Sequence, residues 1–284
     1  MSESTVHSHP LEVLLREVTE RLAPIDRTPC SPGEREAAEW LARRLRAVPG
    51  FAVELEDEPS WGTFPPTSFA LGSLGVLAAA LSLRGLRRLG SLLAALSFAG
   101  IVDEAQNGPR ILRRLIRRRR TTVNVVARAG EGAATLVVIA HHDAPQTGVI
   151  FDQSLHKRIY ELAPQMIESA RTPPPQWWLG LAGPLGTIAA ALTRRPAFAR
   201  AALSIGAVAT ALVGDVWRNE TVPGASDNLS GVAALVGLAE LFAERPVEGE
   251  RDPLAADVDT VVKAVHLALD GRVVKMGVER GHLD

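Results

Sequence analysis

The chain has 284 residues, which suits one large domain or two small ones with a real core, and its formal net charge at pH 7 is −1. This balance excludes the positive field that a general nucleic-acid binder needs, so we expect no nucleic-acid partner. The single cysteine, Cys30, excludes an internal disulfide framework and a four-cysteine zinc site.

Two amphipathic helices and an edge strand are predicted near the N-terminus. Residues 8–24 and 33–48 carry apolar side chains at helical spacing. Ser31 followed by Pro32 is typical of a helix start, because serine caps and proline fits the first turn. Residues 51–57 alternate between apolar and polar side chains, as a half-buried strand does.

The first apolar block predicts a transmembrane helical hairpin. Residues 67–83 are almost wholly apolar or small, and a shorter uncharged run covers residues 89–102. A helix that crosses a bilayer needs about 17–25 apolar residues. The first run has this length, and the second reaches it if Arg87 and Arg88 extend to the membrane surface.

A second apolar block predicts a second hairpin. Residues 172–193 are uncharged and begin with prolines and two tryptophans, which are typical of a membrane interface. A shorter apolar run follows at residues 201–214. Two hairpins give about four membrane helices and return the chain each time to the side that it left. The alternative is that these runs are buried helices of a soluble core.

The side of the membrane on which the polar sequence lies stays open. Short loops at Arg84–Arg88 and Arg194–Arg195 would be cytoplasmic by the positive-inside rule, which places the polar domain outside. Seven arginines between Arg110 and Arg120 argue for the opposite side. The first 66 residues contain no export signal, and this slightly favours a cytoplasmic domain.

Two polar motifs lie between the apolar blocks and after them. Residues 121–127 and 135–140 read as neighbouring strands, and the second ends directly in His141. Ligands bind at the carboxyl ends of strands in open α/β sheets, and Asp143 is placed to orient the imidazole. A histidine satisfied by hydrogen bonds at a strand end is the alternative interpretation.

The second motif is the segment Gly-Ala-Ser-Asp-Asn-Leu-Ser-Gly, residues 224–231. Its small residues allow a close approach of the backbone, and Asp227 stands just before a helix expected at about 231–244. An aspartate in this position suits a cation, because its carboxylate oxygen atoms can ligate or bridge a metal ion. It also suits a helix cap, for which Asp, Asn and Ser are all favourable.

Together and in this order, the two motifs resemble metallopeptidase family 28, the zinc aminopeptidase and glutamate carboxypeptidase type. The segments Ser-Pro-Gly-Glu-Arg-Glu-Ala-Ala-Glu-Trp-Leu and Val-Asn-Val-Val-Ala-Arg fit the family as well. The resemblance covers about residues 8–58, 121–145 and 219–244. It implies a three-layer α/β domain with a mixed, mostly parallel sheet, of the zinc-exopeptidase kind, with the two apolar hairpins as insertions.

The resemblance also implies the roles of individual residues. His141 matches a ligand of one zinc, Asp227 matches the carboxylate that bridges two zincs, and Asp143 matches the residue that holds the histidine. Asn228 follows at a point where the family often has an unusual peptide geometry. The implied activity is metal-assisted hydrolysis of a peptide with a free N-terminus, in a protein whose other partner is the lipid bilayer.

The chain departs from the family pattern after about residue 245. The family has an adjacent Glu-Glu pair downstream of the bridging aspartate, which supplies the general base and a zinc ligand, and then a further aspartate and histidine. No adjacent glutamate pair occurs in this chain, and residues 262–278 read instead as a hairpin around Asp270-Gly271. His266 and His282 lack the family's surroundings.

Four interpretations of this departure stay open. The chain is an active peptidase completed by tail residues or by a partner chain, a catalytically inactive membrane module, a frame-shifted reading of a longer enzyme, or a transport-related membrane protein. Two zincs are expected for a complete site, and one or none where ligands are missing. The predicted organisation is a peptidase domain in residues 1–66, 110–150 and 219–245, hairpins in 67–109 and 151–218, and a divergent tail in 246–284.

Overall fold

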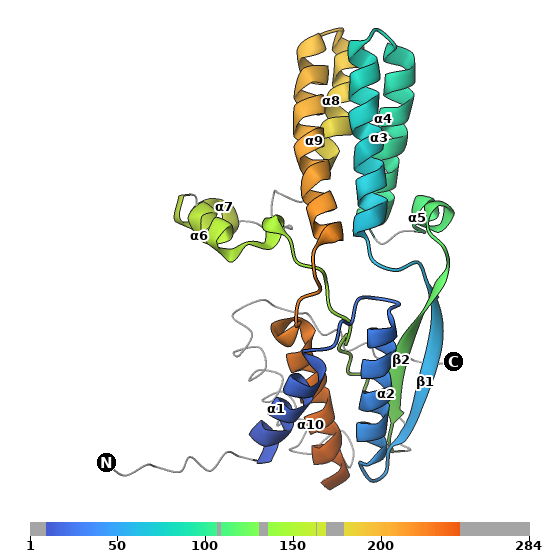
Figure 1. Ribbon diagram of the computed structural model, residues 1–284, viewed down its shortest axis with the longest axis vertical. Helices are drawn as coiled ribbons and strands as arrows, with labels where there is room; N and C mark the ends of the chain where they lie inside the picture. Colours follow the sequence, from blue (N-terminus) through green and yellow to red (C-terminus); the bar gives the residue numbers. More distant parts are fainter. Residues whose placement is uncertain (1–9, 107–108, 131–135, 163, 169–178, 245–284) are drawn as a thin grey trace. The chain divides into compact units, whose positions relative to one another are not determined.

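The computed structural model describes residues 10–106, 109–130, 136–162, 164–168 and 179–244 (Figure 1). The chain divides into two compact units. One contains Met1–Ser60, Thr121–Pro145 and Thr221–Asp284, and the other contains Trp61–Arg120 and Gln146–Glu220. The polar motifs therefore fall in the first unit and both apolar blocks in the second.

The first unit is built around a small helical core. Its helices are α1 (Pro10–Leu22), α2 (Pro32–Arg46) and α10 (Ser230–Glu244), preceded by the irregular turn η3 (Ala225–Leu229). α1 and α10 lie side by side (Figure 1). The buried side chains that α1, α2, η3 and α10 share are Leu14, Val18, Leu22, Ala37, Leu41, Leu229, Val232, Ala233 and Val236.

The start of α2 confirms the predicted helix signal. The backbone N–H of Glu34 donates to Ser31 Oγ at 3.0 Å, and Pro32 occupies the first turn. Serine in this position satisfies one of the N–H groups that have no partner inside the helix. The predicted helices at 8–24, 33–48 and 231–244 are all present with bounds shifted by a few residues.

The predicted three-layer α/β domain with a mostly parallel sheet is wrong. In the described residues the sheet has two antiparallel strands, β1 (Ala52–Ser60) and β2 (Arg120–Arg128), which pair with each other. These strands confirm the predictions at 51–57 and 121–127. Residues 136–140 form no strand, although a strand was predicted there beside β2.

The segment at 136–140 has no neighbouring strand with which it could pair among the described residues. A strand needs a neighbour that satisfies its backbone N–H and C=O groups. The described residues place no strand beside this segment, and Leu136, Val137 and Ile139 are exposed, Ile139 by 80%. Its β-rich composition therefore did not suffice to form a buried strand.

The second unit is a bundle of four helices (Figure 1). The first apolar block forms α3 (Pro65–Leu83) and α4 (Arg87–Ala105), and the second forms α8 (Leu179–Thr193) and α9 (Pro196–Arg218). Two of these helices, α3 and α9, are long and apolar enough to cross a membrane. Short segments flank the bundle: α5 (Ile111–Ile116), η1 (Val149–Phe151), α6 (Gln153–Leu162) and α7 (Pro164–Glu168).

Small residues let the helices of the bundle approach closely. A Cβ added at Gly183 of α8 would lie 3.3 Å from the Cα of Gly206 in α9. Buried hydroxyl groups are satisfied inside the bundle: Ser97 Oγ of α4 donates to the carbonyl of Leu71 in α3 at 2.8 Å. Glycine contacts and hydroxyl hydrogen bonds of this kind hold helices together where no water competes.

Gly90 offers a test of this packing. A Cβ there would lie 2.7 Å from the carbonyl oxygen of Ala78, so Gly90→Ala should lower the free energy of unfolding of the bundle by about 1–3 kcal/mol relative to a matched variant. Gly180→Ala is that variant, because a Cβ at Gly180, in the first turn of α8, meets no atom of a described residue within 4 Å. Thermal unfolding in detergent measures both, and equal stability of the two variants would contradict the packing.

Candidate functional site

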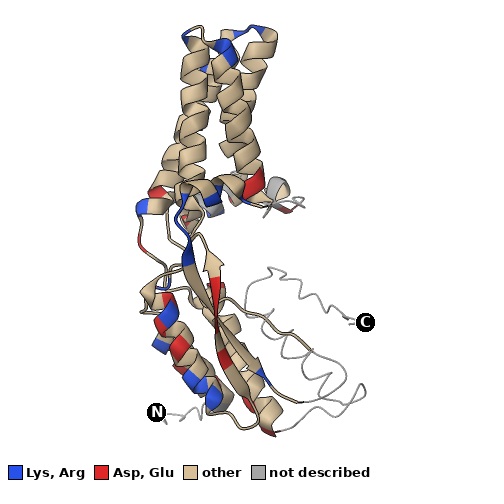
Figure 2. Cartoon of the chain, turned by 90° about the vertical axis from the view of Figure 1, so that its right-hand side faces the viewer, with Lys and Arg blue, Asp and Glu red and all other residues tan. Residues whose placement is uncertain are grey.

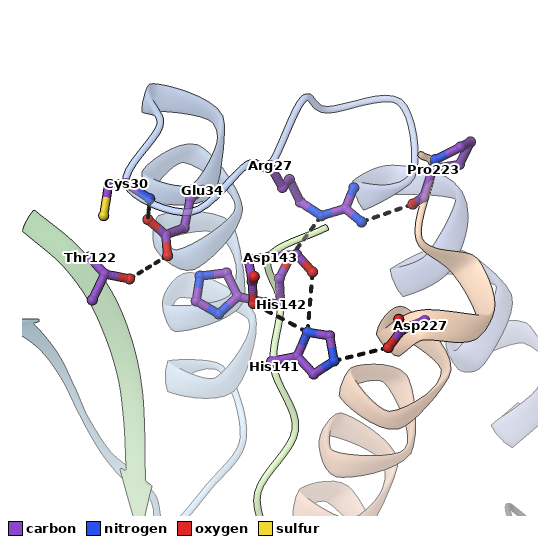
Figure 3. A network of polar contacts seen from close by, with 9 residues as sticks. All are labelled: Arg27, Cys30, Glu34, Thr122, His141, His142, Asp143, Pro223 and Asp227. Atoms are coloured by element: carbon purple, nitrogen blue, oxygen red, sulfur yellow. Dashed lines mark hydrogen bonds and ion pairs between the residues drawn. The ribbon is translucent and has the colours of Figure 1, made fainter. Parts of the chain in front are cut away.

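His141 and Asp227 meet in the first unit although 86 positions separate them. His141 Nε2 lies 3.1 Å from Asp227 Oδ1 (Figure 3). His141 belongs to the extended segment after residue 136, and Asp227 belongs to η3 just before α10. This distance agrees with the prediction that the two side chains converge, while their assignment as metal ligands stays a prediction.

Asp143 lies on the other side of the imidazole ring. Its Oδ1 is 3.2 Å from His141 Nδ1, and its carbonyl oxygen is 3.3 Å from the same atom (Figure 3). Hydrogen bonds to Asp143 and Asp227 raise the pKa of His141 to about 10. Burial acts to raise the pKa of Asp143, but the hydrogen bond with His141 and its charge lower it on balance. The two carboxylates therefore stabilise positive charge at this point.

The distance between the two facing atoms fits two ligands of one zinc ion. Ligand atoms about 2.0–2.1 Å from a tetrahedral zinc lie about 3.3 Å apart, close to the 3.1 Å between His141 Nε2 and Asp227 Oδ1. A hydrogen bond from a carboxylate to the other ring nitrogen, as Asp143 makes, is the usual arrangement behind a metal-bound histidine.

The ligand set is incomplete in the part of the chain that the structure describes. That part contains no group of three or more His, Cys, Asp or Glu side chains that could hold a metal ion together. Catalytic zinc sites use three protein ligands and keep one open position. His266, His282 and the window at 257–263 lie outside the described residues.

The turn that carries Asp227 has an irregular backbone. Gly224 has a φ of +65°, which glycine adopts without steric cost, and the N–H of Leu229 donates to the Gly224 carbonyl at 3.0 Å. The peptide bond between Asp227 and Asn228 is cis, at the position where the family resemblance implies an unusual peptide geometry. The turn brings Asp227 toward His141 and leads directly into α10 (Figure 3).

Arg27 connects the two segments that carry the pair. Its side chain is 0% exposed; Nε donates to the His142 carbonyl at 2.9 Å, and one terminal nitrogen donates to the Pro223 carbonyl at 2.8 Å (Figure 3). The other terminal nitrogen donates to the carbonyls of Leu22 and Ile25. Burial lowers the pKa of Arg27. One guanidinium therefore fixes the segment of His141, the segment of Asp227 and the end of α1.

Backbone hydrogen bonds reinforce this connection. The N–H of Ala144 donates to the Arg27 carbonyl at 2.9 Å, and the N–H of Val222 donates to the Pro145 carbonyl at 3.0 Å. Thr221 Oγ1 also donates to a carboxylate oxygen of Asp26 at 2.7 Å. The loop after α1 and the two motif segments are thus held together independently of the His141–Asp227 contact.

A second buried polar group lies next to His142. Glu34 is 3% exposed and accepts hydrogen bonds from the Cys30 N–H at 2.7 Å and from the Thr122 hydroxyl (Figure 3). Burial raises the pKa of Glu34 and lowers the pKa of His142. These contacts join the start of α2 to β2, so Glu34 stabilises the frame of the site.

The sequence did not predict Arg27 or Glu34 as residues of the site. Each is a charged residue in or near a loop, where charged side chains are usually exposed. The available signal was weak: Glu34 stands three residues after Ser31, the spacing of a capping box, and its carboxylate accepts from the Cys30 N–H instead of the Ser31 N–H.

The site is a histidine–carboxylate pair with a second carboxylate behind the ring, which defines it as a candidate for binding a cation. Comparisons with models of protein families, with curated proteins and with solved structures find no match to this chain. The functional assignment therefore rests on the geometry of the site and on the sequence motifs.

Proposed function

We propose that this chain is a membrane-associated, zinc-dependent exopeptidase of the aminopeptidase type, in which His141 and Asp227 supply two ligands of the metal site. The observation that carries this proposal is the 3.1 Å distance between His141 Nε2 and Asp227 Oδ1, with Asp143 on the opposite ring nitrogen. The remaining ligands come from residues outside those described or from a second chain. The substrate is a peptide with a free amino terminus.

The residues of the site have separate tasks in this proposal. Zinc, when bound, polarises the scissile carbonyl and lowers the pKa of a water molecule. Asp143 holds the His141 ring so that Nε2 faces Asp227. Arg27 keeps the two motif segments at a fixed separation, because its donors reach both. The general base has no candidate among the described residues.

The exposed surface of the bundle supports the membrane part of the proposal. Only 39% of the apolar window in α3 and 28% of that in α9 is buried inside the bundle, whereas the core helices of soluble proteins are mostly buried. Large apolar side chains are also exposed on the other two helices, for example Leu92 of α4 and Leu192 of α8. Lipid covers such surfaces, so we propose that all four helices cross the bilayer together.

Hydrolysis assays on the full chain in detergent test the activity. We expect release of aniline from aminoacyl-anilides that a chelator abolishes and added zinc restores, with at least one zinc per chain. Asp227→Asn should remove most of this turnover. Asp57→Asn should leave the turnover unchanged, because Asp57 of β1 is exposed and forms an ion pair with Arg35 of α2. Turnover that resists the chelator would contradict a zinc-dependent reaction.

A second candidate function is a catalytically inactive membrane module. The absence of a third ligand beside His141 and Asp227 among the described residues favours it. The same assay separates the two candidates. Less than one zinc per chain together with no chelator-sensitive turnover supports the inactive module and contradicts the peptidase.

A further inference from the structure

One end of the four-helix bundle is basic. Three arginines lie at the turn between α3 and α4, and three lie at the turn between α8 and α9 and in the first turns of α9: Arg84, Arg87, Arg88, Arg194, Arg195 and Arg200. Figure 2 shows these turns with basic residues and without Asp or Glu. All six side chains are exposed, and no salt bridge to a described residue engages any of them. Their charge is therefore available to an anionic partner.

A shallow, open groove combines part of this charge with an apolar surface. It has a volume of about 500 Å³ and is lined by Arg87, Arg88, Ser91 and Leu92 of α4 and by Ala191 of α8. The two arginines begin α4, and Leu92, which is 69% exposed, lies about one turn further along the helix. The groove is thus positive toward the end of the bundle and apolar toward its middle.

We propose that this groove binds one anionic phospholipid, whose headgroup phosphate pairs with Arg87 and Arg88 and whose acyl chain lies along Leu92 and Ala191. The inference rests on the membrane part of the proposed function and is independent of zinc. The planar guanidinium groups match phosphate oxygens, and basic residues at the ends of membrane helices are typical partners of anionic headgroups.

The mixed lining favours a lipid over other anions. A free phosphate would pair with the two arginines but make no contact with Leu92. Diffuse attraction to a negatively charged leaflet would involve all six arginines to a similar degree, because their charge is equal and none is buried. Only a bound lipid uses both the charged and the apolar part of the groove.

Lipid binding to the full chain, purified in detergent without zinc, tests the proposal. Native mass spectrometry with phosphatidylglycerol should give one tightly bound lipid per chain, and phosphatidylcholine should bind at least about 10-fold more weakly. Arg87→Gln with Arg88→Gln should weaken phosphatidylglycerol binding by about 10- to 30-fold. Arg194→Gln with Arg195→Gln is the matched control: it removes the same charge outside the groove and should weaken binding by less than about 3-fold.

Four outcomes would overturn the groove as a lipid site. Equal losses in the two double variants would assign the effect to diffuse charge, and equal binding of both lipids would remove the role of the headgroup. Displacement of the lipid by an equal concentration of glycerol phosphate would identify a site for soluble phosphate. A chain that stays soluble without detergent would overturn the membrane assignment as well as the lipid site. A failure to bind zinc would contradict the proposed peptidase but leave the lipid result unaffected.

Discussion

Replacing Arg27 with methionine should lower the free energy of unfolding of the first unit by about 3 kcal/mol or more. The Arg27 side chain is completely buried and donates to four backbone carbonyls, those of Leu22, Ile25, His142 and Pro223. Methionine keeps the apolar part of the side chain but removes the donor of the Ile25, His142 and Pro223 carbonyls, whereas the Leu22 carbonyl keeps the N–H of Ile25. Each unsatisfied buried acceptor costs about 1–3 kcal/mol.

Chemical unfolding of the full chain in detergent, followed by circular dichroism, measures this effect. Arg43→Met is the matched control, because Arg43 is exposed on α2 and its loss should change stability by less than about 0.5 kcal/mol. The free energy of unfolding of Arg27→Lys should lie between those of Arg27→Met and Arg43→Met, because one ammonium group cannot reproduce the planar array of donors. If Arg27→Met were as stable as Arg43→Met, Arg27 would not hold the two motif segments together.

Removing either His141 or Asp227 should weaken zinc binding by more than about 100-fold. Substitutions of residues that only orient a ligand cost about 10–100-fold, which is the range expected for Asp143→Asn. Loss of a metal ligand itself should weaken zinc binding by more than this range. Because the two side chains face one another at 3.1 Å, the effects of His141→Ala and Asp227→Ala should not add in the double variant.

Competition with a chromophoric chelator measures these affinities on purified protein. Asp57→Asn again serves as the control, because its exposed carboxylate pairs with Arg35 in an ion pair outside the site. An unfolded variant would be recognised from its circular dichroism and excluded. Zinc affinity that stays unchanged in both single variants would show that the pair does not bind the metal.

The local elements could be predicted from the sequence because their signals are local. Apolar periodicity and the Ser31 cap are enough for α2, and uncharged runs are enough for the helices of the bundle. The strand at 135–140 was predicted from composition alone. Its formation depends on a neighbouring strand, which composition does not specify.

The His141–Asp227 pair could be predicted because two motifs in a fixed order resemble a known family. Arg27 could not, because its function in the site comes from hydrogen bonds to carbonyl groups 115 and 196 positions away, and any residue type supplies a carbonyl. The packing of the two hairpins into one bundle was likewise not expected. It depends on contacts such as that between Gly183 and Gly206, which belong to different helices.

Zinc X-ray absorption of the full chain shows whether His141 and Asp227 hold a cation between them. The wild-type protein with zinc should show imidazole scattering at a Zn–N distance of about 2.0–2.1 Å, together with oxygen ligands. His141→Ala should lose this imidazole signal, and Asp227→Ala should change the oxygen shell. An imidazole signal that persists in His141→Ala would place the metal on another histidine and contradict the site.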